Sequence, residues 1–120
     1  MVSKRILFLL RQPPYATSHA LEALEAILVT GVFEQDVSVL FKDDGVWQLV
    51  SGQDGGQLGV RTVANVAKAL PEYDVSKLFV CESSLAERGL AVDDLVVGVQ
   101  LVKLDDQTAL LAGQDAVVND

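Results

Sequence analysis

The sequence alternates short, almost purely apolar runs with longer segments in which apolar residues recur at helical spacing. The five apolar runs are residues 4–10, 37–41, 77–81, 95–99 and 115–118. Helical spacing is found in residues 19–33, 60–70 and 101–112. Strands that are apolar on both faces are typical of parallel sheets covered by helices. The pattern therefore predicts an α/β fold, a sandwich of helices around a mostly parallel sheet.

Several shorter signals refine this prediction. Residues 46–50 fit either a short helix or a strand. Pro71 is expected to close the preceding helix, since proline cannot continue one. The segment from Ser84 to Glu87 fits a capping box at the start of a very short helix, and Gly89 fits the exit from that helix.

Length and composition limit the classes of protein and site. A half-apolar chain of 120 residues fits one domain, placed here at residues 1–120. One cysteine and one histidine exclude an internal disulfide framework and a His/Cys metal cluster, and we expect no metal and no cofactor. The net charge of −8 is spread along the chain, which argues against direct binding to nucleic acid or an anionic membrane.

The first apolar run is too short for a targeting or membrane segment. Residues 6–10 follow Lys4 and Arg5, but the run stops at Arg11. A signal peptide needs a longer apolar stretch, and a membrane span needs about twenty apolar residues. We therefore expect a cytoplasmic protein in a reducing compartment.

Function in such sheets collects in loops at the carboxyl ends of strands, here residues 11–18, 42–59 and 81–90. The first loop has two prolines and no glycine, which disfavours a phosphate-binding loop, although a flavodoxin-like small-molecule binder stays open as an alternative. Asp43 and Asp44 fit a turn whose charges face solvent. The glycine-rich residues 51–59 match no nucleotide-binding fingerprint.

Cys81 is the candidate catalytic residue. It lies at the expected end of a strand, just before a helix start, where backbone N–H groups can stabilise a thiolate. A cysteine there could carry sulfur as a persulfide. Glu82 and Glu87 oppose this role because negative neighbours raise a thiol pKa. The alternative is a buried cysteine that packs as a small apolar side chain.

The helix expected at residues 19–33 has an unusually narrow polar stripe. Glu22 and Glu25 are its only charged residues. A helix at the surface of a domain normally keeps a wider polar face. Either this helix is deeply packed within its own domain or a partner covers part of it.

Three sequence blocks together resemble one family. They are residues 11–17 leading into the helix around 22–25, residues 39–49 with Gly52 and Gln53, and residues 83–90. The chain is similar in these blocks to the TusC/DsrF subunit type of the DsrE/DsrF/DsrH family. The resemblance implies a three-layer α/β/α sandwich with a five-stranded, mostly parallel sheet.

The resemblance also implies a function. Such subunits assemble with TusB-like and TusD-like subunits into a heterohexamer, which passes persulfide sulfur from a TusA-like donor towards a TusE-like carrier. The sulfur ends in 2-thiouridine at the tRNA wobble position, whereas the Dsr relatives serve sulfur oxidation. The family's sulfur-carrying cysteine lies in the TusD/DsrE subunit. We therefore expect a non-catalytic accessory subunit, with persulfide carried on Cys81 as the alternative.

Overall fold

The central feature of the computed structural model, which describes residues 4–13, 19–33, 36–50 and 63–119, is a five-stranded sheet. Its strands are β1 (Arg5–Leu10), β2 (Asp36–Phe41), β3 (Lys77–Cys81), β4 (Gln100–Val102) and β5 (Ala116–Asn119). Across the sheet their order is β4-β3-β2-β1-β5, and every neighbouring pair is parallel. The α/β fold predicted from the alternating pattern is confirmed.

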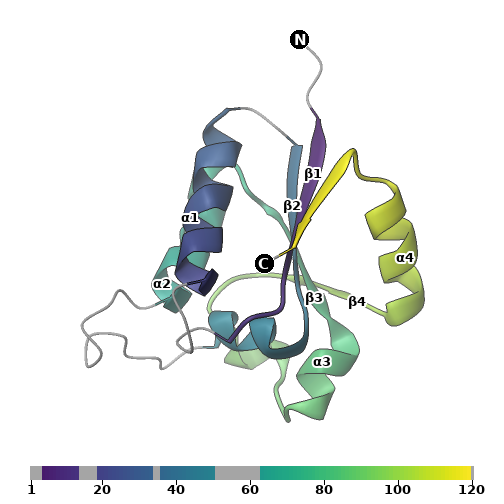
Figure 1. Ribbon diagram of the computed structural model, residues 1–120. Coiled ribbons are helices and arrows are strands. Elements are labelled where there is room, and N and C mark those ends of the chain that lie inside the picture. The colour runs from purple at the N-terminus through teal and green to yellow at the C-terminus, as the bar shows by residue number, and fades with distance from the viewer. Residues whose placement is uncertain (1–3, 14–18, 34–35, 51–62, 120) are drawn as a thin grey trace.

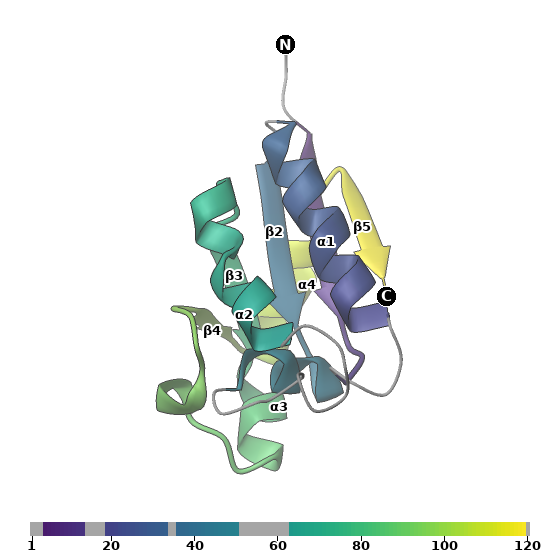
Figure 2. The same cartoon turned by 90° about the vertical axis from the view of Figure 1, so that its left-hand side faces the viewer.

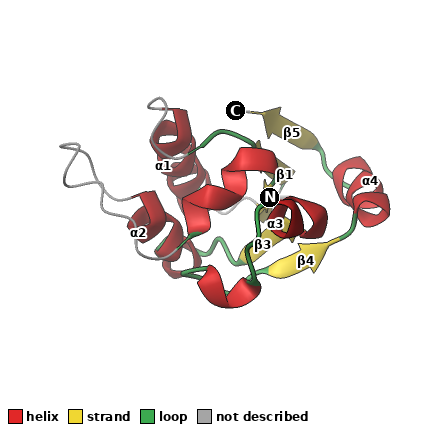
Figure 3. Ribbon diagram, turned by 90° about the horizontal axis from the view of Figure 1, so that it is seen from below, coloured by secondary structure: helices red, strands yellow, loops and turns green. Residues whose placement is uncertain are grey.

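Helices cover both faces of this sheet. The α-helices are α1 (His19–Val32), α2 (Val63–Lys68), α3 (Glu82–Glu87) and α4 (Leu104–Ala112). Short 3₁₀ helices are η1 (Asp43–Leu49), η3 (Leu70–Tyr73) and η4 (Val92–Asp94). Helices α1 and α2 lie on one face and α4 lies on the other (Figures 1 and 3). Figure 2 shows α1 and α2 side by side in front of the strands. None of the helices that the structure describes has the length and apolar character needed to span a bilayer.

Alternation along the strands gives the sheet two apolar cores. Phe8, Leu10 and Val39 belong to the larger core. Leu24 and Ile27 of α1 pack against them from the helical layer on that face of the sheet. The opposite face carries a smaller core made by the buried residues Leu7, Leu9 and Leu40, against which Leu110 and Leu111 of α4 pack. Because successive side chains of a strand point to opposite faces, one short run of apolar residues serves both cores.

The fourth strand differs from its prediction. Residues 95–99 were expected to form it, but the strand is β4, Gln100–Val102, and the helix predicted from residue 101 begins at Leu104. Leu95 instead forms an antiparallel bridge with Val50, and the Val96 N–H donates to the Leu49 carbonyl at 2.8 Å. The apolar run is half-buried by packing against the larger core rather than by pairing within the sheet. Local hydrophobicity cannot distinguish these two kinds of burial.

The predicted helix boundaries agree with the structure less well than the predicted strand boundaries do. Residues 46–50 are not a strand; residues up to Leu49 form the end of η1. Helix α3 begins at Glu82, so Ser84 is inside the helix and the predicted capping box at Ser84 is wrong. Gly89, with φ of 67°, does end that helix as expected. The α-helix before Pro71 stops at Lys68, and Pro71 lies in the first turn of η3.

Candidate functional site

Cys81 is the last residue of β3 and immediately precedes α3, as the sequence predicts. Its neighbour across the sheet is Val102 of β4. The alternation of β3 places its side chain on the face that α4 covers, together with Phe79. The residue is fully buried, with an exposed fraction of 0%. The thiol therefore lies beneath α3 and α4 instead of at the protein surface.

Polar groups surround the sulfur in spite of this burial. The Sγ of Cys81 lies 3.3 Å from the Oγ of Ser83. Burial raises the pKa of the thiol, whereas hydrogen bonds from the hydroxyls of Ser83 and Ser84 lower it. Gln107 and the Ser84 backbone add further hydrogen bonds, so that the pKa of Cys81 falls from 9.0 to about 7. Close to neutral pH, a large fraction of the thiol is therefore the nucleophilic thiolate.

Gln107 reaches this site from α4. It is buried, and its Nε2 donates at 3.1 Å to the carbonyl of Val102, the β4 residue that pairs with Cys81. Its Oε1 is buried and has no hydrogen-bond partner within the described part of the chain. The place of Gln107 was not predictable from the sequence, because a single glutamine in an expected helix gives no sign that it faces a cysteine in another element.

A pocket of about 510 Å³ opens beside the thiol. It is lined by Glu82, Ser83, Ala86, Lys103, Leu104 and Asp105. Ser83 both lines this pocket and contacts the Cys81 sulfur, so its side chain lies between the two. The charged groups of the lining are two carboxylates and one ammonium group. One residue, Ser83, therefore belongs both to the lining of this pocket and to the surroundings of the Cys81 sulfur.

Helix η1 contacts α3 through several polar bonds. The N–H of Asp43 donates to Ser84 Oγ at 3.0 Å. Arg88 donates to Asp44 Oδ1 through Nε at 3.2 Å and Nη2 at 3.0 Å, and through Nη1 to the Ser84 carbonyl at 3.1 Å. Asp43 also lies 3.4 Å from Arg11. Both carboxylates are exposed, as expected for a turn, but the sequence did not predict that each has a cationic partner.

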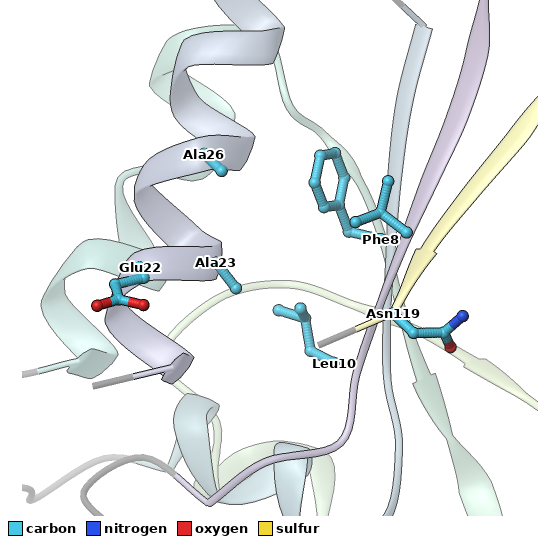
Figure 4. A pocket seen from close by; sticks show the side chains of 7 residues that line it. Phe8, Leu10, Glu22, Ala23, Ala26 and Asn119 are labelled. Atoms are coloured by element: carbon cyan, nitrogen blue, oxygen red, sulfur yellow. The ribbon is translucent and has the colours of Figure 1, made fainter. Parts of the chain in front are cut away.

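A second pocket, of about 380 Å³, lies between α1, β1 and β5. This is where the strand order changes direction, a common place for ligands in α/β sheets. Figure 4 shows Ala23 and Ala26 facing Phe8 and Leu10, while the Glu22 carboxylate points away from the two strand residues. Among the residues that the structure describes, the lining thus offers no inward-pointing titratable group, so Cys81 is the better candidate for chemistry.

Other segments considered from the sequence add little to this site. Residues 14–18 of the first loop and the glycine-rich residues 51–59 lie outside the described part of the chain. Within the described part, no group of three or more His, Cys, Asp or Glu side chains is placed to hold a metal ion. The site that the structure does describe is therefore a single thiol with its hydroxyl and amide neighbours.

Comparison with known proteins places these features in context. Residues 4–119 match the model of the DsrE/DsrF-like family. The chain is 45% identical over 95 residues to the intracellular sulfur oxidation protein DsrF of Allochromatium vinosum, covering 79% of this chain and 70% of that protein. It is 39% identical over 119 residues to a TusC homolog of Pseudomonas aeruginosa, covering 98% of each chain.

A solved structure is similar in fold. The ychN protein from E. coli superposes with a TM-score of 0.85, covering 98% of this chain and 99% of that chain. Sequence identity between the two is 18%. The likeness therefore concerns the fold alone, a five-stranded sheet with helices on both faces.

Proposed function

The chain belongs to the DsrE/DsrF-like family, and from this premise we propose that it is an accessory subunit of a sulfur-relay complex. Its partners are TusB-like and TusD-like subunits in a heterohexamer. The complex passes persulfide sulfur from a TusA-like donor towards a TusE-like carrier, for 2-thiouridine formation at the tRNA wobble position. In this role the chain is cytoplasmic, functions as one domain and binds no nucleic acid itself.

The observation that carries the accessory role is the burial of Cys81. Sulfur transfer between two proteins requires the accepting sulfur to come within bonding distance of the donor's persulfide. An exposed fraction of 0% prevents this contact while α3 and α4 keep their positions. A subunit with its one cysteine enclosed is better suited to position a partner's reactive cysteine than to exchange sulfur with a carrier.

Co-expression with the TusB-like and TusD-like chains of the same organism tests this proposal. We expect the three chains to elute together from a size-exclusion column. Cys81→Ser should enter the complex and leave the 2-thiouridine content of tRNA unchanged, whereas deletion of the whole chain should abolish the modification. A chain that stays monomeric beside both partners contradicts the proposal.

A second candidate function is that Cys81 carries sulfur itself, and its lowered pKa of about 7 favours this role. In the step required, the Cys81 thiolate attacks the terminal sulfur of the donor's persulfide. A bond forms between the Cys81 Sγ and that sulfur, the donor's S–S bond breaks, and the donor leaves as a thiolate. The reaction needs no external oxidant, because the transferred sulfur keeps its oxidation state. The pocket lined by Ser83 is the route of approach.

Mass spectrometry separates the two candidate functions. The protein is exposed to a persulfide donor in complex with its partners, and its mass is measured without reduction. A gain of one sulfur atom that is absent from Cys81→Ser supports transfer to this chain. Unchanged 2-thiouridine in Cys81→Ser cells rules out a required carrier role for Cys81.

A DsrF-like role in sulfur oxidation is the alternative pathway. It is favoured by the relative at 45% identity, whose name refers to intracellular sulfur oxidation. Deleting the chain distinguishes the two pathways. Loss of 2-thiouridine supports tRNA thiolation, and loss of growth on reduced sulfur compounds with normal 2-thiouridine supports oxidation.

A further inference from the structure

We propose that Cys81 accepts sulfur from a small amino-acid persulfide that enters the pocket beside it, and that Ser83 controls access from this pocket to the sulfur. The inference rests on the second candidate function, for which it names the class of donor. It replaces a protein donor by a molecule small enough to be enclosed between α3 and α4.

The first step is the contrast between the thiol and the pocket beside it. Cys81 has an exposed fraction of 0%, so a folded protein cannot bring its persulfide to the sulfur while α3 and α4 keep their positions. The pocket lies between α3 and the start of α4 and has a volume of about 510 Å³. Sites for small molecules typically measure about 300–1,000 Å³. The space beside the thiol therefore suits a small donor and excludes a folded one.

The second step is the place of Ser83. Its Oγ lies 3.3 Å from the Sγ of Cys81, and the same half-buried residue lines the pocket. A side chain moves between a few staggered rotamers, and a rotamer that turns the hydroxyl away from the sulfur breaks this contact. A donor in the pocket reaches the sulfur only after that movement. The hydrogen bond and the access of a donor are therefore alternative states of one side chain.

The third step is the charge of the lining. Glu82 and Asp105 contribute carboxylates, Lys103 contributes an ammonium group, and Ala86 and Leu104 contribute apolar surface. An amino-acid persulfide such as that of free cysteine carries one carboxylate, one ammonium group and a short apolar stem. Each charge of such a donor has a group of opposite sign in the lining. The charges thus favour a zwitterionic donor over a purely anionic one.

The fourth step is an unused acceptor on α4. Gln107 lies one turn before Leu110, which packs on the sheet face that carries the Cys81 side chain. Its Nε2 is taken by the carbonyl of Val102, the residue beside Cys81 in the sheet, whereas no described residue donates to its buried Oε1. A buried acceptor without a donor is costly. The S–H group of a sulfur atom added to Cys81 would supply that donor.

The transfer itself balances without an oxidant. The Cys81 thiolate attacks the outer sulfur of the donor R–S–SH. A bond forms between the Cys81 Sγ and that sulfur, the S–S bond of the donor breaks, and the electron pair leaves on R–S⁻, which takes a proton from water. The transferred sulfur keeps its hydrogen, so Cys81 ends as the hydropersulfide.

The donor is tested on the full chain by mass spectrometry without reduction. The two probes are cysteine hydropersulfide and a folded protein that carries its persulfide on a surface cysteine. We expect cysteine hydropersulfide to add one sulfur atom to the chain but not to Cys81→Ser, and we expect no adduct from the protein probe. Ala86→Phe narrows the pocket away from the sulfur, and it should slow the reaction with cysteine hydropersulfide about tenfold while leaving the thiol pKa unchanged.

The role of Ser83 is tested by alkylation with iodoacetamide over a range of pH. Cys81 is the chain's one cysteine, so all modification of thiol belongs to it. In Ser83→Ala the limiting rate constant at high pH should rise about fivefold, because the hydrogen bond no longer has to break. The midpoint of the pH profile should rise as well, since a donor to the thiolate is lost. A merely structural role would not change both quantities in this way.

The matched control is Ser76→Ala. Ser76 also lines a pocket, but one at the opposite end of β3 from Cys81, and neither the rate constant nor the midpoint should change. Circular dichroism confirms that each variant is folded. Labelling is repeated in low concentrations of urea, because a reaction through global unfolding accelerates steeply with denaturant, whereas a reaction through the pocket does not.

The possible failures are distinguishable. An adduct from the protein probe, or an unchanged rate in folded Ala86→Phe, overturns the inference and leaves the carrier function intact. A limiting rate in Ser83→Ala equal to that of Ser76→Ala, or labelling that follows global unfolding, overturns the role of Ser83. No adduct from either probe rejects the carrier function together with the inference, while the accessory role, which needs no sulfur on Cys81, is unaffected.

Discussion

At the scale of single residues, Gly45 shows how closely η1 approaches the sheet. A Cβ built on Gly45 would meet the carbonyl oxygen of Leu10, and it would lie 2.6 Å from the Leu10 carbonyl carbon. Leu10 is the last residue of β1, and its carbonyl accepts from the Lys42 N–H at 3.0 Å. Glycine is therefore required here for close contact between two backbones. The sequence shows a turn signal at this position but not the contact that requires it.

Gly45→Ala should consequently destabilise the protein. Overpacking against a backbone that cannot move freely costs about 3 kcal/mol, so the urea midpoint should fall clearly. Gly98→Ala is the control, because no heavy atom of the residues described in the structure lies within 4 Å of a Cβ at Gly98. That variant should stay within about 0.5 kcal/mol of the parent protein. Equal midpoints for the two variants would contradict the close packing described.

The Cys81 thiol should make stability depend on pH. Its folded pKa of about 7 is below the ordinary value of 9.0, so folding favours the thiolate. The resulting stabilisation is present in full above pH 9 and is lost as the pH falls through 7. Relative to Cys81→Ser, the free energy of unfolding should rise by about 2 kcal/mol between these limits. Parallel denaturant curves for both proteins measure it, and a constant difference would refute the lowered pKa.

At the scale of elements, the narrow polar stripe of α1 is explained in part by packing within this chain. Leu24 and Ile27 are fully buried against the sheet, whereas Val29 is 58% exposed. Phe33, in the turn that follows the helix, is 69% exposed. Packing within this chain therefore accounts for one apolar face of the helix and leaves further apolar side chains in contact with solvent.

Substitutions on the two faces of α1 should differ strongly in effect. Leu24→Ala removes a fully buried side chain from the larger core and should lower the free energy of unfolding by about 3 kcal/mol. Val29→Ala, on the exposed face, should change it by less than about 0.5 kcal/mol. Chemical denaturation of both variants measures the difference. A similar loss in Val29→Ala would mean that this face is packed within the chain.

At the scale of the whole molecule, the two ends of the chain are joined side by side in the sheet. Strand β5 pairs with β1, and Asp115 precedes it. The Arg5 N–H donates to Asp115 Oδ2 at 2.8 Å, and the Asp115 N–H donates to the Arg5 carbonyl at 2.7 Å. The backbone bond from Arg5 and the charge of its side chain lower the pKa of Asp115. This reciprocal pair sets the register in which β5 joins the edge of the sheet.

Asp115→Ala should therefore loosen β5 without unfolding the rest of the protein. We expect faster amide hydrogen exchange in residues 116–119, with little change in β2 and β3. Asp115→Asn keeps a side-chain acceptor and should show a smaller effect. Because the pKa of Asp115 is lowered, the protection it confers is present at neutral pH and lost as acid protonates the carboxylate. Uniform exchange rates in the variant and the parent would contradict this role.

The sequence by itself determined the fold class, the positions of most strands and the place of Cys81 at a strand end. These properties follow from local hydrophobic patterns, which strands and helices reflect directly. The predicted position of β4 was wrong, because an apolar run can be buried either by packing against the core or by pairing within the sheet, and the sequence does not distinguish the two.

Only the tertiary structure decided how the thiol is surrounded. The Asp43–Ser84 bond spans 41 positions of sequence and the Asp44–Arg88 bond spans 44. Such contacts depend on which loops come together at the carboxyl edge of the sheet. A local sequence pattern does not predict this, because the loops are far apart in the sequence. The same holds for the burial of Cys81 under α4, because burial is a property of all the layers together and a strand carries no signal of what will cover it.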